Sequence, residues 1–77
     1  MNDRRYTIIL YPDTEEGGYT VIVPALPGCV TQGETIEEAI AMGKDAIQLY
    51  IETLLAEDLP IPEEQEHLQA IVVGVAA

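Results

Sequence analysis

The stretch that decides the fold is TIEEAIAMGKDAIQLYIETLLAE, residues 35–57. Its opening, Thr35-Ile36-Glu37-Glu38, fits a helix capping box, in which the threonine hydroxyl accepts from the backbone N–H of Glu38 and the Glu38 carboxylate reaches back. Apolar residues then recur every three or four positions, which predicts one long apolar helix face. They are Ile36, Ala39, Ile40, Gly43, Ala46, Ile47, Tyr50, Ile51, Leu54 and Leu55. Because Pro60 and Pro62 prevent continuation, we expect the helix to end near Glu57.

Short runs rich in β-branched and aromatic residues flank this helix and predict strands at 4–12, 19–23, 29–32 and 68–75. Pro12 and Pro24 end the first two, since proline cannot donate to a sheet ladder. The order is β-β-β-α-β, so we expect a single α+β domain over residues 1–77, an antiparallel sheet with one long helix on one face. Gly43 lies on the apolar helix face, which predicts a close approach of helix and sheet.

Two geometric features predict self-association into a dimer or tetramer. The helix would be about 33 Å long, whereas strands of this length span about 17–27 Å, so its C-terminal part is expected to overhang the sheet. The strands are also apolar on both faces, and one helix covers only one of them. The predicted oligomer interface comprises Tyr50, Ile51, Leu54, Leu55, Ile71 and Val73. Alternatively, strand twist lets loops cover the second face.

The chain is strongly acidic, with fourteen Asp and Glu against three Lys and Arg and a formal net charge of −11. Such a surface repels nucleic acids and anionic membranes, so we expect no direct binding to either. It also attracts basic protein partners. The candidate partner-binding residues are Asp13, Glu15, Glu16, Glu57 and Asp58. The alternative interpretation is that the acids only keep a small domain soluble.

Residues suited to catalysis or metal binding are sparse. The chain contains no serine, one cysteine, Cys29, and one histidine, His67, so neither a nucleophile–base pair nor a zinc spacing is visible. Clustered acids such as Asp13, Glu15 and Glu16 can hold Mg²⁺ in nucleases, but a solvated turn explains them better. We therefore predict no catalytic residue, no metal and no cofactor, and a chain that is not an enzyme.

Neither a secretory signal nor a membrane-spanning run is visible in the sequence. Together with the single thiol, this makes the cytoplasm the expected location.

Residues 17–40, GGYTVIVPALPGCVTQGETIEEAI, closely resemble the core of the HicB antitoxin family. The resemblance extends over most of the chain, from about Tyr6 to Pro62, and its most specific part is the Pro-x-Leu-Pro-Gly-Cys loop followed by Gly-x-Thr-x-Glu-Glu-Ala. It implies a partial RNase H-like fold without the nuclease's acidic residues, and commonly self-association.

The resemblance also implies a role, namely neutralising a HicA toxin, a small basic ribonuclease with an active-site histidine. Many family members carry a C-terminal DNA-binding domain, and because this sequence stops at Ala77, we expect a stand-alone member without one. The favoured hypothesis is an antitoxin-type module that binds a basic, mRNA-cleaving toxin. The alternative is a homo-oligomeric scaffold or small-ligand-binding protein with no toxin.

Overall fold

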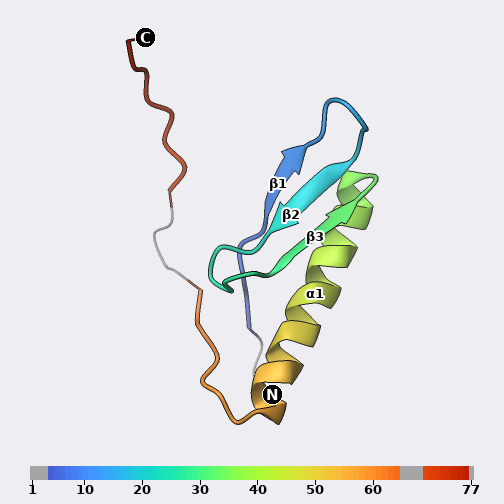
Figure 1. Cartoon of the computed structure of the whole chain (residues 1–77), viewed down its shortest axis with the longest axis vertical. Coiled ribbons are helices and arrows are strands. Elements are labelled where there is room, and N and C mark those ends of the chain that lie inside the picture. Colours follow the sequence, from blue (N-terminus) through green and yellow to red (C-terminus); the bar gives the residue numbers. More distant parts are fainter. Residues whose placement is uncertain (1–3, 65–68, 77) are drawn as a thin grey trace.

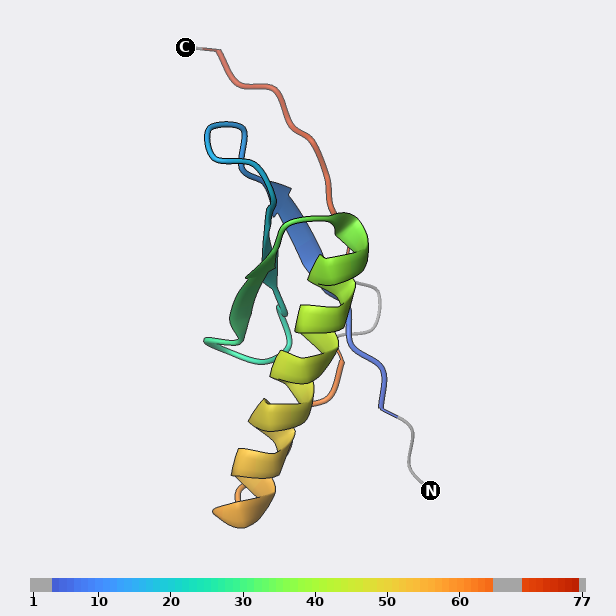
Figure 2. The same cartoon turned by 90° about the vertical axis from the view of Figure 1, so that its right-hand side faces the viewer.

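A computed structural model describes residues 4–64 and 69–76 of the chain. Three strands, β1 (Ile9–Pro12), β2 (Tyr19–Ile22) and β3 (Val30–Gly33), are followed by one helix, α1 (Ile36–Ala56). The strands form an antiparallel sheet in the order β1-β2-β3. Figures 1 and 2 show α1 along one face of this sheet, which confirms the predicted α+β class.

The strand register assigns each side chain to one of two faces. Val21 pairs with Leu10 on one side and Thr31 on the other, and this row faces α1 because the Val21 side chain meets Gly43. The next row, Ile9, Ile22 and Val30, points the other way, since successive strand residues alternate between faces. We call this second side the outer face.

The first turn of α1 begins with the expected cap. The Thr35 hydroxyl accepts from the Glu38 backbone N–H at 3.0 Å. The Glu38 carboxylate reaches back one residue further than the capping box predicts, and accepts from the backbone N–H of Glu34 at 3.0 Å. Glu37 and Glu38 also lie in the first turn, where the positive end of the helix dipole favours carboxylates.

Asp58, in a left-handed conformation with φ of 56°, ends α1. Its N–H donates to the Leu55 carbonyl at 3.2 Å, and the Leu59 N–H donates to the Leu54 carbonyl at 2.9 Å. These two bonds form a Schellman motif, which satisfies carbonyls that have no partner inside the helix. The helix therefore ends before Pro60, as the sequence predicts.

The core lies where the sheet, α1 and the loop after β2 meet. Val23, Leu26 and Cys29 form its centre, with Tyr6, Ile8, Ala46, Ile47 and Tyr50 packed against it. Leu26 is fully buried at the centre of a tight loop. Three backbone hydrogen bonds close this loop: the Val23 N–H donates to the Cys29 carbonyl, the Leu26 N–H to the Val23 carbonyl, and the Cys29 N–H to the Leu26 carbonyl. The small buried residues Ala39 and Gly43 let α1 lie directly on the strands.

The prediction of a final strand over 68–75 was wrong for the residues that the structure describes. Residues 69–76 are extended but carry no strand pairing, and Figure 1 shows them apart from the sheet. Leu68 lies outside the described residues, as does His67. β1 also begins at Ile9 rather than residue 4, because β2 ends at Ile22 and offers no partner to the preceding residues. A strand forms only where a neighbour accepts its hydrogen bonds.

Candidate protein-binding surfaces

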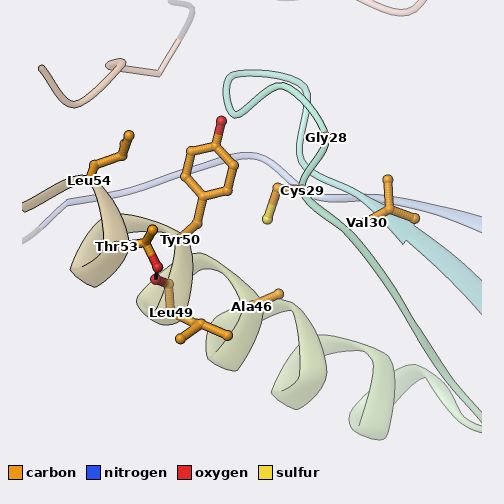
Figure 3. A pocket seen from close by; sticks show the side chains of 8 residues that line it. All are labelled: Gly28, Cys29, Val30, Ala46, Leu49, Tyr50, Thr53 and Leu54. Atoms are coloured by element: carbon orange, nitrogen blue, oxygen red, sulfur yellow. Dashed lines mark hydrogen bonds between the residues drawn. The ribbon is translucent and has the colours of Figure 1, made fainter. Parts of the chain in front are cut away.

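An apolar groove runs between the C-terminal half of α1 and the loop before β3. Its cavity measures about 420 Å³. It is lined by Gly28, Cys29, Val30, Ala46, Leu49, Tyr50, Thr53 and Leu54. Figure 3 shows the Tyr50 ring rising from α1 toward the loop that carries Gly28. We call this hollow the α1 groove.

Two local features fix the walls of the α1 groove. The Tyr50 hydroxyl donates to the Pro27 carbonyl at 2.8 Å and so holds the helix and the loop together. Gly28 turns the loop with a φ of +79°, a conformation that glycine adopts without steric cost. Cys29 lies behind this wall, and desolvation by burial raises the pKa of its thiol above the ordinary value of 9.0. The residues that line the groove therefore include one neutral thiol and no charged side chain.

The six residues predicted as an oligomer interface fall in two separate places. Tyr50 and Leu54 line the α1 groove, Ile51 is half-buried beside them, and Leu55 is exposed on the same part of α1. Ile71 and Val73 lie instead in the extended segment 69–76. Leu49, which sequence reasoning did not select, lines the groove with its side chain 65% exposed.

The turn between β1 and β2 holds three of the predicted partner-binding acids. One oxygen of Asp13 accepts from the backbone N–H groups of Glu15 at 3.0 Å and Glu16 at 3.1 Å. These hydrogen bonds to the charged form hold the pKa of Asp13 below its ordinary value of 3.8. Asp13 therefore orders the turn, while the carboxylates of Glu15 and Glu16 are exposed.

This turn adjoins the start of α1. A polar hollow of about 220 Å³ lies between them, lined by Asp13, Gly17, Tyr19, Thr20, Gln32, Gly33, Glu34 and Glu38. The fold thus brings Asp13 and Glu34, which are 21 positions apart in the sequence, to one end of the molecule. We call this region, made of Asp13, Glu15, Glu16, Glu34 and Glu38, the acidic end.

The other two predicted partner-binding acids, Glu57 and Asp58, lie at the far end of α1. Figure 1 shows the β1–β2 turn and the end of α1 at opposite ends of the fold. The five predicted residues therefore do not form one surface. Glu34 and Glu38 were missed because their sequence signal was that of a helix cap, and only the packing of α1 on β3 brings them next to the turn.

The outer face of the sheet is the third candidate surface. Figure 2 shows α1 on one side only. On the other side Tyr11 is more than half exposed, and Ile9 and Ile22 are half-buried. Val30, 57% exposed at the start of β3, belongs to this face and also borders the α1 groove. Among the residues that the structure describes, the loops therefore leave part of this face exposed.

The amino-acid sequence matches one protein-family model over residues 6–73, described as the HicB-like antitoxin of bacterial toxin–antitoxin systems. The chain belongs to this family. A UPF0150 protein of Thermoplasma acidophilum is 50% identical over 60 residues, covering 78% of this chain and 86% of that protein. A UPF0150 protein of Synechocystis sp. is 49% identical over 59 residues, covering 77% and 73%.

One relative bears the name of an antitoxin. Antitoxin HicB 1 of Photorhabdus laumondii is 39% identical over 72 aligned positions, and the match covers 88% of this HicB-like chain but 46% of that antitoxin. Membership of the HicB-like family supports an antitoxin role and a toxin as the kind of partner.

The surfaces of this HicB-like chain combine apolar and acidic areas. Within residues 4–64 and 69–76, no group of three or more His, Cys, Asp or Glu side chains is placed to hold a metal ion. In the same residues, no helix is both long enough and apolar enough to cross a membrane. The α1 groove supplies apolar area and the acidic end supplies charge, and these are the components of a protein interface.

Proposed function

We propose that this chain is an antitoxin-type binding module that neutralises a small, basic, mRNA-cleaving HicA-like toxin by direct contact, without catalysis of its own. The observation that carries the proposal is the acidic end, where Asp13 of the β1–β2 turn lines one hollow with Glu34 and Glu38, and the same turn carries the exposed Glu15 and Glu16. The cations Arg4, Arg5 and Lys44 all lie outside these two segments. A basic ribonuclease is attracted to such a field, and a bound partner is kept from RNA.

The proposal places the chain in the cytoplasm, where a toxin that cleaves mRNA acts, and it assigns the chain no direct contact with nucleic acid. With a net charge of −11, the surface repels phosphates. It also retains self-association: the α1 groove or the segment 69–76 serves contacts between copies, while the acidic end stays available to the toxin. Glu57 and Asp58, at the opposite end, contribute to long-range attraction only.

Co-expression with a HicA-like toxin tests the proposal. The native chain is expected to restore growth and to co-purify with the toxin, with an association rate that falls as salt is added. Changing Glu15 and Glu16 to lysine should slow association by about tenfold or more, whereas the same change at Glu57 and Glu63, away from the acidic end, should have a smaller effect. Absence of binding to any basic HicA-like protein would refute the antitoxin function.

A second function, small-ligand binding by a homo-oligomer with no toxin, is favoured by one observation. The α1 groove has about 420 Å³ of space and mostly apolar walls, within the size range of small-molecule sites, about 300–1,000 Å³. An apolar dye that binds the native chain and is released by Leu49→Lys, with no toxin bound under any condition, would support this function over the first.

A further inference from the structure

The segment 69–76 carries apolar side chains that the rest of its own chain does not cover. Its exposed fractions are 72% for Ile71, 99% for Val72, 75% for Val73 and 85% for Val75. The backbone is extended, and Figure 1 shows it running free of the sheet. An uncharged, extended segment rich in β-branched residues has a high propensity to form a strand. Pairing with another strand would bury its side chains and give hydrogen-bond partners to its backbone N–H and C=O groups.

The edge strand β1 offers the complementary half of such a contact. In the described residues β1 pairs only with β2, so its other edge is unpaired. The opposite edge of the sheet, at β3, is flanked by α1, and the Gly33–Ala39 contact joins the two. An added strand therefore finds its free template at β1, where a backbone ladder supplies the contact.

After the helix, residues 62–64 contact the residues just before β1, whereas residues 69–76 lie apart from β1. The Tyr6 hydroxyl donates to the Pro62 carbonyl at 2.5 Å, and the Thr7 N–H donates to the Glu64 carboxylate at 3.0 Å, with the Thr7 hydroxyl on the same oxygen. Residues 62–64 thus lie beside the residues that precede β1. Beyond residue 69, however, the described chain diverges from its own β1 (Figure 1).

We propose that residues 69–76 of one copy pair with the free edge of β1 in a second copy, and that the exchange is reciprocal. Each chain carries one such segment and one such edge. In a two-fold symmetric dimer, the segment of each copy can therefore pair with the edge of the other, which leaves neither unpaired. The inference deepens the self-association proposed above and does not depend on a toxin.

The distribution of charge favours a second copy at this contact in particular. Two chains that each carry a net charge of −11 repel one another. Residues 8–12, IILYP, and 69–76, QAIVVGVA, contain no charged side chain, so pairing them brings no carboxylates face to face along the ladder. Contact through the acidic end would do so. The exchanged pair also leaves the acidic end of each copy exposed.

Proline substitution separates this exchange from the other possible interfaces. Val73→Pro removes a backbone donor and fixes φ, which disrupts a paired strand, while the matched variant Val73→Thr keeps a β-branched side chain. Sedimentation of the chain alone is expected to give a dimer for the native chain and Val73→Thr, and a monomer for Val73→Pro. The helical circular-dichroism signal should persist in all three, because the Val73 side chain is 75% exposed and lies outside the core.

Isotope-filtered NMR on a refolded mixture of labelled and unlabelled chains locates the contact. Nuclear Overhauser effects between copies, from Leu10 or Tyr11 to residues 71–75, are the expected result. A native monomer would overturn the exchange. So would a dimer that survives Val73→Pro and dissociates with Leu49→Lys, which would assign the interface to the α1 groove. A failure of toxin binding by a strand-exchanged dimer would count against the antitoxin proposal alone.

Discussion

Gly33 and Ala39 touch: a Cβ atom on Gly33 would lie 2.5 Å from the backbone nitrogen of Ala39 and 2.7 Å from its Cα. This contact joins the end of β3 to the first turns of α1. It also holds Glu34 and Glu38 beside the β1–β2 turn, because both residues flank the contact. The position of the acidic end therefore depends on a glycine.

Gly33→Ala should destabilise the fold severely. Backbone atoms, which cannot rotate away, occupy the place of the new methyl group, so α1 must shift from β3. Overpacking of this kind costs about 1–3 kcal/mol. Urea unfolding would measure the loss, and it should be accompanied by weaker association with a basic toxin. Unchanged stability would mean that helix and sheet are less closely joined than the structure shows.

Gly43→Ala is the matched control and should have the opposite sign. A Cβ atom at Gly43 meets the Val21 Cγ1 at 3.4 Å and two Ile8 methyl groups at 3.5 Å, which is ordinary van der Waals contact. Alanine is also favoured over glycine inside a helix by about 1 kcal/mol. We expect a rise in the free energy of unfolding of up to that amount. A loss would show that the close approach predicted from the sequence does require glycine here.

Thr35→Ala should destabilise the chain by about 1 kcal/mol, the typical value of a helix N-cap. The substitution removes the oxygen that accepts from the Glu38 N–H at 3.0 Å. Thr35→Ser retains that oxygen and should lose much less. Thermal and urea unfolding of the two variants, compared with the native chain, would separate the cap from the loss of a methyl group. Equal losses would contradict the capping role.

Asp58→Gly should stabilise the chain by up to about 1 kcal/mol, because glycine tolerates the left-handed region that a side chain disfavours. Asp58 holds a φ of 56° there. Asp58→Ala, which removes the same carboxylate but keeps a Cβ atom, should be no more stable than the native chain. If both variants gained the same free energy of unfolding, the cause would be the removal of a negative charge from the C-terminus of α1 rather than the relief of backbone strain.

Stability should fall in alkali partly because of Cys29. Burial raises the pKa of this thiol in the folded state above its ordinary value of 9.0, so the unfolded chain loses the proton first as the pH rises. The thiol's contribution is therefore complete below pH 9 and is lost above it. The difference in unfolding free energy between the native chain and Cys29→Ala, measured from pH 7 to 11, should shrink with pH. A constant difference would contradict the burial of the thiol.

Local rules predicted most of the fold correctly. The cap at Thr35, the apolar periodicity of α1 and the stop before Pro60 are short-range features, so the bounds Ile36–Ala56 follow almost directly from residues 35–60. The turn glycines, the proline that ends β1 and the proline that follows β2 likewise separate the strands. The final strand could not be predicted in the same way, because Ile71 and Val73 have the right propensity but pairing requires a neighbour that the sequence pattern does not supply.

The candidate site residues likewise fall into those that local patterns predicted and those that required the tertiary structure. Tyr50 and Leu54 were found from helix periodicity, which places them on one face whatever the fold. Glu57 and Asp58 were grouped with Asp13 by charge alone, and the structure puts them at opposite ends. Distance between residues far apart in the chain depends on how elements pack, and charge carries no information about that.

By itself, the sequence determined the acidic character, the helix with its two ends, the three-stranded order before it and the resemblance to the HicB-like family. These depend on composition, on hydrogen bonds within a few residues and on side-chain period. Only the tertiary structure decided that Asp13 and Glu38 share one hollow, that Tyr50 and Pro27 close one groove, and that residues 69–76 leave their own sheet. Each of these depends on contacts between distant segments, whose free energy arises from burial and pairing that no local rule contains.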